Sequence, residues 1–312
     1  MRPTRRRTCG HRSSGRSPGS GRGPRMYETH YGFRESPFKI TPDPRFLYLT
    51  KSHRDTLAYL EYGVRERKGI LVVSGEVGTG KTLMVRTLLN QLPEEIESAV
   101  VMNARLEFNE LLYLALLDFG AAPKSRTKID LLVLLQEFLL GIRNRGGTAL
   151  LVVDEAQTLS ADSLEEFRLL SNLETNTEKL LQILLVGQPE LKIALQQHSL
   201  RQLRQRVPGV CDLSKLPPES IWEYVEHRLH IASEGHCRGL FHREAIDEVA
   251  RYADGIPRRI NQVCDRALLI GYARGEDRIG APHVREAIQD LEDGFLGIPG
   301  AAPVSGRSMG ER

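Results

Sequence analysis

The sequence has only four cysteines, Cys9, Cys211, Cys237 and Cys264, and no two of them form a C-x-x-C pair. This usage argues against a disulfide scaffold and fits a reducing compartment. Uninterrupted apolar runs are short, as in 149–153, and none approaches the roughly 20 residues that a membrane helix needs. The N-terminus is charged but lacks the apolar segment of a secretory signal. We therefore expect a cytoplasmic protein without direct membrane insertion.

Acidic residues are absent from positions 1–25, which hold eight arginines among Gly, Ser and Pro. The whole chain carries a formal charge of +3, so the remainder carries −5, and the basic isoelectric point describes this segment rather than the folded body. Without apolar periodicity the segment cannot bury enough surface to fold. It is either a nucleic-acid-binding arm or the product of a start codon assigned too early, and the change of composition at Met26 favours the second interpretation.

The rest of the chain is organised around a glycine-rich segment at 74–82. An apolar run precedes it, a helical pattern follows it, and its spacing G-x-x-x-x-G-K-T is that of a phosphate-binding loop. Backbone N–H groups of such a loop wrap a polyphosphate, and the helix that begins there adds its positive end. Lys81 would reach the β- and γ-phosphates of ATP, and Thr82 would offer its hydroxyl to Mg²⁺. The predicted nucleotide-binding residues are Gly75, Glu76, Val77, Gly78, Thr79, Gly80, Lys81 and Thr82.

A second apolar run, 148–153, ends in two carboxylates, Asp154 and Glu155. A buried parallel strand with an acidic turn is common and would explain the pattern by itself. Together with the glycine loop upstream, the pair predicts an ATPase site. Asp154 would hold Mg²⁺ through its water shell, and Glu155 would polarise the attacking water.

A third apolar run, 181–187, is followed by Gln188. Ligands of doubly wound sheets bind at the carboxyl ends of the strands, so Gln188 is a candidate sensor of the γ-phosphate. The same residue could equally cap a helix that begins at Pro189.

Three arginines, Arg201, Arg204 and Arg206, follow in a short helical pattern. They could form a solvated helix face, or one of them could cross a subunit boundary to a neighbour's nucleotide.

Other segments give weaker predictions. Residues 26–49 are irregular but rich in aromatics, and we expect them to pack on the core. Ser52 with Asp55, and Asp162 with Glu165, resemble pairs that cap helices. The pattern at 128–143 is apolar almost all round and predicts a buried helix.

Pro217 and Pro218 mark a domain boundary, after which the periodicity is helical at 219–234, 242–253, 257–274 and 282–292. The segment 294–312 is rich in Gly, Pro and Ser and is expected to be a flexible tail. The zinc-capable residues of this region match no structural zinc spacing, so helix-surface and loop positions explain them better; they are His227, His230, His236, Cys237 and His242.

In this order, the motifs resemble those of the AAA+ ATPases, and more specifically those of the general secretion pathway protein A group. The similarity extends from about residue 26 to residue 293. The segments that carry it are 31–38 (YGFRESPF), 41–46 (TPDPRF), 75–82 (GEVGTGKT), 154–157 (DEAQ) and 185–191 (LVGQPEL).

The resemblance implies an α/β fold: a three-layer P-loop ATPase domain with a parallel sheet at 26–215, followed by a small all-helical lid domain at 216–293. It implies Gln188 as the first sensor and Arg258 as the second. It favours Arg206 as the arginine that acts in trans, with Arg201 and Arg204 as alternatives, and therefore a homo-oligomer. Longer members carry a membrane helix and a peptidoglycan-binding segment after the lid, and those properties are not implied for this chain.

Three functions compete. The first is an ATP-hydrolysing assembly or energising factor for a bacterial secretion, pilus or exopolysaccharide export system, held near the inner membrane by a membrane-protein partner. The second is a DNA-acting ATPase of the transposition type. The third is a nucleotide-dependent switch with little turnover. Glu155 favours hydrolysis, and the interleaving of arginines with acids outside 1–25 favours the first function over DNA binding.

Overall fold

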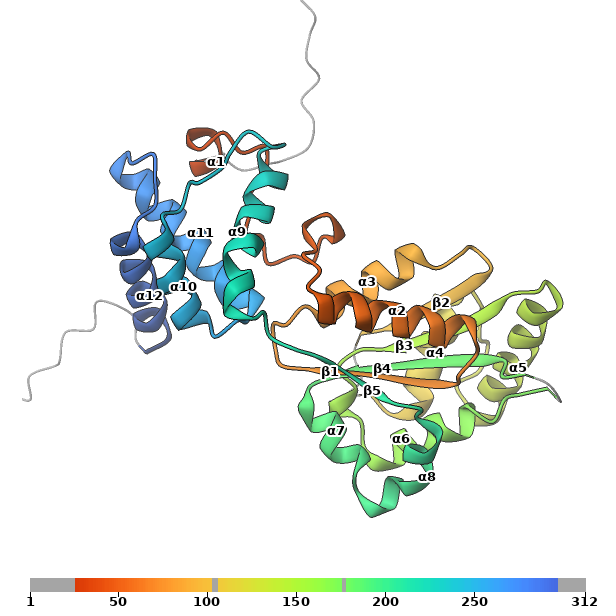
Figure 1. Cartoon of the computed structure of the whole chain (residues 1–312). Helices are drawn as coiled ribbons and strands as arrows, with labels where there is room; N and C mark the ends of the chain where they lie inside the picture. The colour runs from red at the N-terminus through yellow and green to blue at the C-terminus, as the bar shows by residue number, and fades with distance from the viewer. Residues whose placement is uncertain (1–25, 103–105, 176–177, 297–312) are drawn as a thin grey trace, which may run out of the picture.

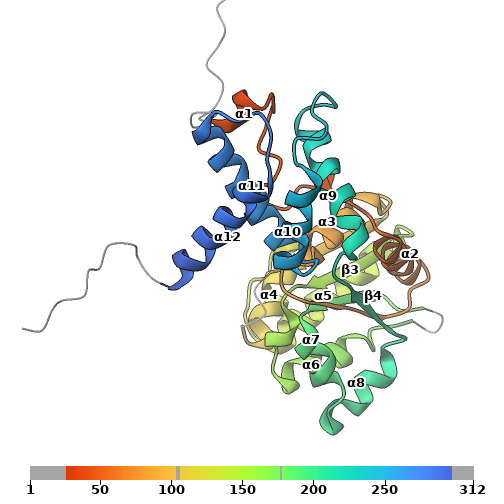
Figure 2. The ribbon, with the colours of Figure 1, turned by 60° about the vertical axis from the view of Figure 1, so that its left-hand side comes forward.

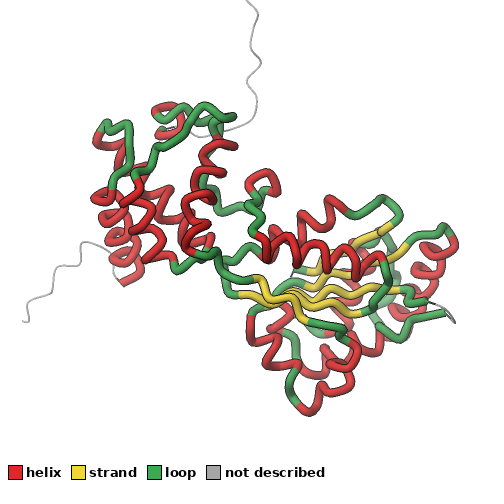
Figure 3. The backbone as a smooth tube through the Cα atoms, in the orientation of Figure 1, coloured by secondary structure: helices red, strands yellow, loops and turns green. Residues whose placement is uncertain are grey.

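The computed structural model describes residues 26–102, 106–175 and 178–296, so the basic segment 1–25 and most of the predicted tail lie outside the described residues. The described chain forms two lobes, one built around a sheet and one made of helices (Figures 1 and 3). Pro217, predicted as the boundary, immediately precedes the first helix of the helical lobe.

The sheet is parallel, with its strands in the order β2-β3-β4-β1-β5. Their bounds are β1 Ile70–Gly75, β2 Ile96–Val101, β3 Thr148–Val153, β4 Leu181–Gly187 and β5 Val210–Leu213. The inner strands β1, β3 and β4 are buried on both faces, which explains why they are apolar without alternation. Because β1 lies beside β4, and β4 beside β3, the carboxyl ends of these three strands meet at one edge.

Helices cover both faces of the sheet, which confirms the predicted three-layer arrangement. One face packs against α2 (Lys51–Arg65) and α3 (Lys81–Gln91) through residues such as Leu60 and Leu88. The other face packs against five helices. These are α4 Phe108–Asp118, α5 Lys128–Asn144, α6 Ala161–Leu170, α7 Pro189–Leu195 and α8 Arg201–Arg206.

The helical lobe has a hydrophobic core of its own. Its helices are α9 Pro218–Ala232, α10 Arg243–Ala253, α11 Pro257–Arg274 and α12 Ala281–Leu296. The last of these runs beyond the predicted end at residue 292, so residues 294–296 belong to a helix rather than to the tail.

The N-terminal segment packs on a hydrophobic core, and that core is the one of the helical lobe. The buried side chains of Tyr27, Phe33, Phe38 and Phe46 belong to the same hydrophobic cluster as α9–α12. The short helix α1 (Tyr27–His30) contacts α11, and the two remain side by side when the molecule is turned (Figure 2). The described part of the chain therefore starts on the helical lobe, the predicted lid, and crosses to the sheet lobe before α2.

Three local predictions were wrong. Thr50 rather than Ser52 caps α2, because its hydroxyl is the one that accepts from the backbone N–H of the first turn, that of His53. Ser160 rather than Asp162 caps α6 for the same reason, accepting from Ser163. Helix α5 buries only one face, and Ile129 is 75% exposed. Across the described parts of the chain, no helix has the length and apolar composition to cross a membrane.

Candidate functional site

A cavity of about 240 Å³ lies between the two lobes at the carboxyl edge of the sheet. The loop after β1, the turn after β3 and the residue after β4 all reach it, and α11 closes it from the lid. The predicted residues that line it are Val77, Gly78, Gly80, Lys81, Thr82, Glu155, Gln188 and Arg258. Predicted residues that lie far apart in the sequence are therefore brought together in one site.

The glycine loop has the conformation that its sequence predicts. Gly78 and Gly80 have φ values of 84° and 99°, in the left-handed region that favours glycine, and Gly80 directly precedes α3. The Lys81 side chain is buried and its Nζ donates to the carbonyl oxygens of Gly75 and Glu76, at 2.8 and 3.0 Å. Burial lowers the pKa of Lys81, although the carboxylates around it oppose that shift. A buried ammonium at a helix N-terminus suits a polyphosphate ligand.

Thr82 lines the cavity and lies beside Asp154, the residue that follows β3. The Thr82 hydroxyl donates to Oδ2 of Asp154 at 3.0 Å, and the Asp154 side chain is buried. A hydroxyl beside a carboxylate at the phosphate end of the loop is a suitable oxygen donor set for Mg²⁺. The two residues predicted as metal ligands therefore fit that ion.

Glu155 follows Asp154 in a left-handed backbone conformation, with φ of 55°. Its Oε2 accepts from Nε2 of Gln157 at 2.6 Å and from Nε2 of Gln188 at 3.2 Å. The bond from Gln157 lowers the pKa of Glu155 most, with further lowering by Gln188 and by the charge of Lys81, whereas partial burial opposes the shift. The carboxylate is thus ionised at neutral pH, the form that a general base requires.

Gln188 occupies the position that precedes α7, but its side chain makes no capping bond to that helix. The amide points instead to Glu155, between the end of β3 and the end of β4. Gln188 could be either a sensor of the γ-phosphate or a helix cap. Its side chain faces the cavity, which favours the first interpretation.

The lid reaches the phosphate loop through Arg258. The backbone N–H of Arg258 donates to the carbonyl oxygen of Gly78 at 3.2 Å, and the side chain lines the cavity. Arg258, predicted as the second sensor, therefore lies at the cavity on the side of the helical lobe.

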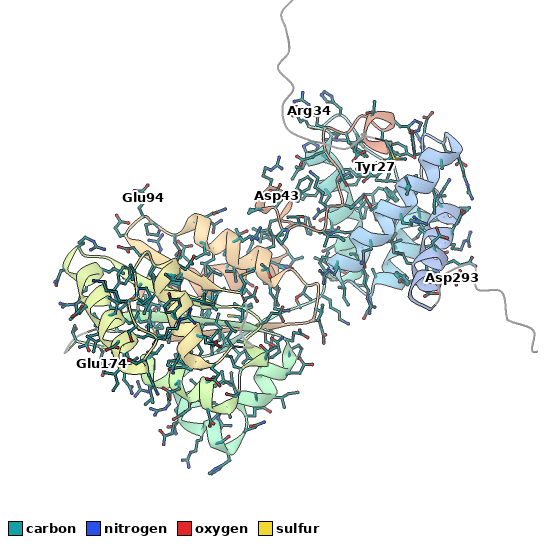
Figure 4. The ribbon with its side chains drawn as sticks, turned by 180° about the vertical axis from the view of Figure 1, so that it is seen from behind. Tyr27, Arg34, Asp43, Glu94, Glu174 and Asp293 are labelled. Atoms are coloured by element: carbon teal, nitrogen blue, oxygen red, sulfur yellow. The ribbon has the colours of Figure 1, made fainter. Side chains whose placement is uncertain are left out.

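The N-terminal segment forms a further wall of the cavity, which the sequence patterns did not reveal. Residues 39–43 line it, and Asp43 lies between the two lobes in Figure 4. Residues 37–43 form a strap between the lobes. The carbonyl oxygen of Pro42 accepts from Arg86 of α3 at 2.8 Å, which links the strap to the sheet lobe.

Arg228 of α9 holds the strap from the lid side. It is buried, and it donates from Nε to the carbonyl oxygen of Pro37 at 2.7 Å and from Nη2 to that of Lys39 at 3.4 Å. Its guanidinium also lies 4.8 Å from the ring centre of Phe46. The signal that we missed is its spacing, because Arg228 occupies a position in the apolar stripe of α9, with Tyr224 and Val225 one turn earlier.

The arginines of α8 do not line the cavity. Arg201, Arg204 and Arg206 are exposed, and Arg204 donates to the carbonyl oxygen of Gln196 at 3.3 Å. The pKa of Glu174 is lowered mainly by Lys179 and to a smaller extent by the charge of Arg206. Figure 4 places Glu174 at the end of the sheet lobe that is remote from the lid. Arg206 therefore lies on an outer surface of the sheet lobe.

The zinc-capable residues of the lid stay dispersed. Within the described residues, no three His, Cys, Asp or Glu side chains gather as a structural zinc site would require. His227 and Cys237 are half-buried, and burial lowers the pKa of the first and raises that of the second.

Comparisons with known proteins agree with this architecture. Residues 64–195 match a family model described as an AAA domain. Over 255 residues the chain is 41% identical to General secretion pathway protein A of Aeromonas hydrophila, covering 81% of this chain and 46% of that protein. The chain thus spans about half the length of this relative.

Solved structures share the fold at low sequence identity. The ORC2 protein of Aeropyrum pernix, solved in ADPNP-ADP complexes, has a TM-score of 0.63 at 18% identity, covering 83% of this chain and 72% of that one. A chain of Drosophila ORC bound to DNA has a TM-score of 0.65 at 19% identity, covering 95% of this chain and 74% of that one.

Proposed function

Because the chain belongs to the general secretion pathway protein A group of the AAA+ proteins, we propose that it binds ATP with Mg²⁺ and hydrolyses it to ADP and phosphate. The observation that carries this proposal is the convergence of Lys81, Glu155, Gln188 and Arg258 on one cavity. Each comes from a different segment, and together they supply two cations, a carboxylate base and an amide.

The residues divide the reaction between them. The N–H groups of the loop and the Lys81 ammonium bind the β- and γ-phosphates and neutralise their charge. Thr82 and Asp154 would hold Mg²⁺, which screens the phosphate oxygens. The Glu155 carboxylate accepts a proton from the attacking water, while Gln188 and Arg258 stabilise charge on the transferred group.

Two variants test this assignment. Lys81→Ala should lose binding of a fluorescent ATP analogue, because it removes the ammonium at the helix N-terminus. Glu155→Gln should bind ATP with unchanged affinity and release phosphate at least roughly a hundredfold more slowly. Glu137→Gln, an exposed glutamate of α5, is the matched control. Turnover of Glu155→Gln at the rate of the unsubstituted protein would remove the base assignment.

In the cell we propose that ATP hydrolysis energises the assembly of a bacterial secretion, pilus or exopolysaccharide export system. The sequence relative named above supports an envelope role. A homo-oligomer is required if one of the exposed arginines of α8 acts on the nucleotide of a neighbouring copy. The partner would be an inner-membrane protein that keeps the chain at the cytoplasmic face. Co-purification with such a protein from the native envelope system, lost in the Lys81→Ala variant, tests the partner.

Two alternatives rest on particular observations. A DNA-acting ATPase of the transposition type is supported by the fold that the chain shares with DNA-bound ORC, at an identity that indicates fold alone. A nucleotide-dependent switch with little turnover is supported by the two amides that restrain Glu155. Steady-state phosphate release with and without duplex DNA separates the three functions.

A further inference from the structure

The side chain of Gln157 joins two residues of the site without entering the cavity. Its Nε2 donates to Oε2 of Glu155 at 2.6 Å, and its Oε1 accepts from the backbone N–H of Gln188 at 3.0 Å. Glu155 and Gln188 both line the cavity, whereas Gln157 does not. One amide therefore connects the end of β3 to the end of β4.

The surroundings fix this amide in place. Gln157 lies in a single turn of 3-10 helix, Ala156–Thr158, and its Oε1 is directed at the start of α7. A Cβ on Gly187 would lie 3.0 Å from that Oε1 and 2.8 Å from Leu191, so the glycine leaves the room that the amide occupies. The left-handed φ of Glu155 turns its carboxylate back toward Gln157 and Gln188.

We propose that Gln157 is a positioning residue that holds the Glu155 carboxylate and the Gln188 tip of β4 as one unit. The inference rests on the proposed function, in which Glu155 is the base and Gln188 the sensor. Gln188 is tied at its backbone, so its side chain stays free to leave Glu155 for a phosphate oxygen. When the Gln188 amide leaves Glu155, the hydrogen bond from Nε2 of Gln157 still orients the Glu155 carboxylate.

The role has two separable consequences. Removal of Gln157 should leave ATP affinity unchanged, because the residue does not line the cavity, and should lower kcat roughly tenfold through loss of orientation. kcat should therefore fall without a matching change in the KM for ATP, a split that a general loss of folded protein would not give.

Other charged groups near Glu155 must stay in place if a change in kcat is to report on Gln157. Lys81 of α3 lowers the pKa of Glu155, Asp154 precedes it in the chain, and Arg258 of α11 lines the same cavity. Glu190 of α7 acts on Lys81. None of them donates to or accepts from Gln157, so a Gln157 substitution leaves them in place.

The test compares Gln157→Met, Gln157→Glu and the exposed-surface control Gln136→Met in the full chain. Gln157→Met removes both bonds, and we expect kcat to fall roughly tenfold with the KM for ATP unchanged. Gln157→Glu keeps an acceptor for the Gln188 N–H but sets a second carboxylate against Glu155, so kcat should fall at least as far. ATP affinity, measured by titration with a fluorescent ATP analogue, should match that of Gln136→Met throughout.

An unchanged kcat in Gln157→Met and Gln157→Glu would overturn the positioning role and leave the proposed function standing. A fall in ATP affinity parallel to the fall in kcat would also overturn it. Absence of Glu155-dependent hydrolysis in the unsubstituted chain would instead overturn the proposed function, and this inference with it.

Discussion

The backbone N–H of Arg258 donates to the carbonyl oxygen of Gly78 at 3.2 Å, and the two residues belong to different lobes. A Cβ on Gly78 would lie only 2.7 Å from the Cβ of Arg258, so the backbones meet where a larger residue would not fit. The lid is thus attached to the phosphate loop by its backbone. The Arg258 side chain can therefore be changed without removing that attachment.

Arg258→Ala should keep the thermal stability of the protein and lower kcat roughly tenfold, because one cation facing the transferred phosphate is lost. The control is Arg259→Ala, an exposed neighbour that does not line the cavity. Phosphate-release assays and thermal melts of both variants measure the difference. Equal rates in the two variants would show that Arg258 has no part in the reaction.

We predict that Arg206 acts on the nucleotide of a neighbouring subunit. It is exposed and does not line the cavity of its own subunit, so the nucleotide it could reach is that of a neighbour. The ATPase rate per subunit should then rise with protein concentration. Inactive Arg206→Ala subunits mixed with inactive Lys81→Ala subunits should recover part of the activity, since one supplies the pocket and the other the arginine. Mixtures with Arg201→Ala or Arg204→Ala identify which of the three arginines acts. Absence of recovery despite proven co-assembly would remove the role of Arg206.

Arg228→Met should weaken binding of ATP roughly tenfold while leaving binding of inorganic triphosphate unchanged. The reason is that Arg228 holds the strap, whereas the triphosphate needs only the glycine loop and Lys81. Arg243→Met is a matched control, because Arg243 also lies over an aromatic ring of the lid, that of Trp222, but is exposed. Competition titrations with ATP and with inorganic triphosphate measure the ratio of the two affinities in each variant. Parallel loss of both affinities would mean that Arg228 only supports the fold.

Much of this site follows from local sequence. The glycine loop and the Asp154-Glu155 pair each have a spacing that their chemistry requires. Continuous apolar runs predict the buried parallel strands that precede them. The meeting of their carboxyl ends then follows from the topology of such sheets. The glycine loop and the Asp154-Glu155 pair are adjacent in the structure because each follows the carboxyl end of a strand, and the apolar runs predict where those strands end.

The remaining walls depend on contacts between distant segments, which no local pattern encodes. The strap reaches the cavity only because aromatics such as Phe38 pack into the lid core, nearly 200 residues later in the chain. Gln157 was visible in the DEAQ motif, but its role depends on the distance between β3 and β4. Helix α5 was predicted as buried because composition does not tell which apolar face meets the core; Val133 is 51% exposed.

Asp265→Asn should stabilise the lid at neutral pH. Burial raises the pKa of Asp265, which accepts hydrogen bonds from Tyr27 and Ser36. The folded state therefore binds the proton more tightly than the unfolded state, and stability is lost as pH rises through the raised pKa. Asparagine cannot ionise, and its oxygen can accept the same bonds.

Thermal melts between about pH 4 and pH 8 measure this effect, because an unfolded Asp titrates near pH 3.9. The Tm difference between Asp265→Asn and the unsubstituted protein should be largest near pH 8 and should shrink toward zero as the pH falls to 4. The control Asp247→Asn, exposed on α10, should show no such trend. A pH-independent difference would contradict the raised pKa.

The last prediction separates an envelope factor from a DNA-acting ATPase. Binding to duplex DNA requires neutralisation of phosphates, and its affinity falls steeply with salt. Outside 1–25 the chain carries a net charge of −5, and many of its arginines are paired with acids, as Arg65 is with Glu61. A shortened chain that begins at Met26 should therefore show no salt-sensitive DNA binding in the presence of ATP and Mg²⁺, and no DNA-stimulated hydrolysis. The full chain serves as the comparison, because binding that needs residues 1–25 comes from their eight arginines rather than from the ATPase. Micromolar binding by the shortened chain that weakens between roughly 50 and 200 mM salt, with faster turnover on DNA, would replace the envelope function by the transposition type.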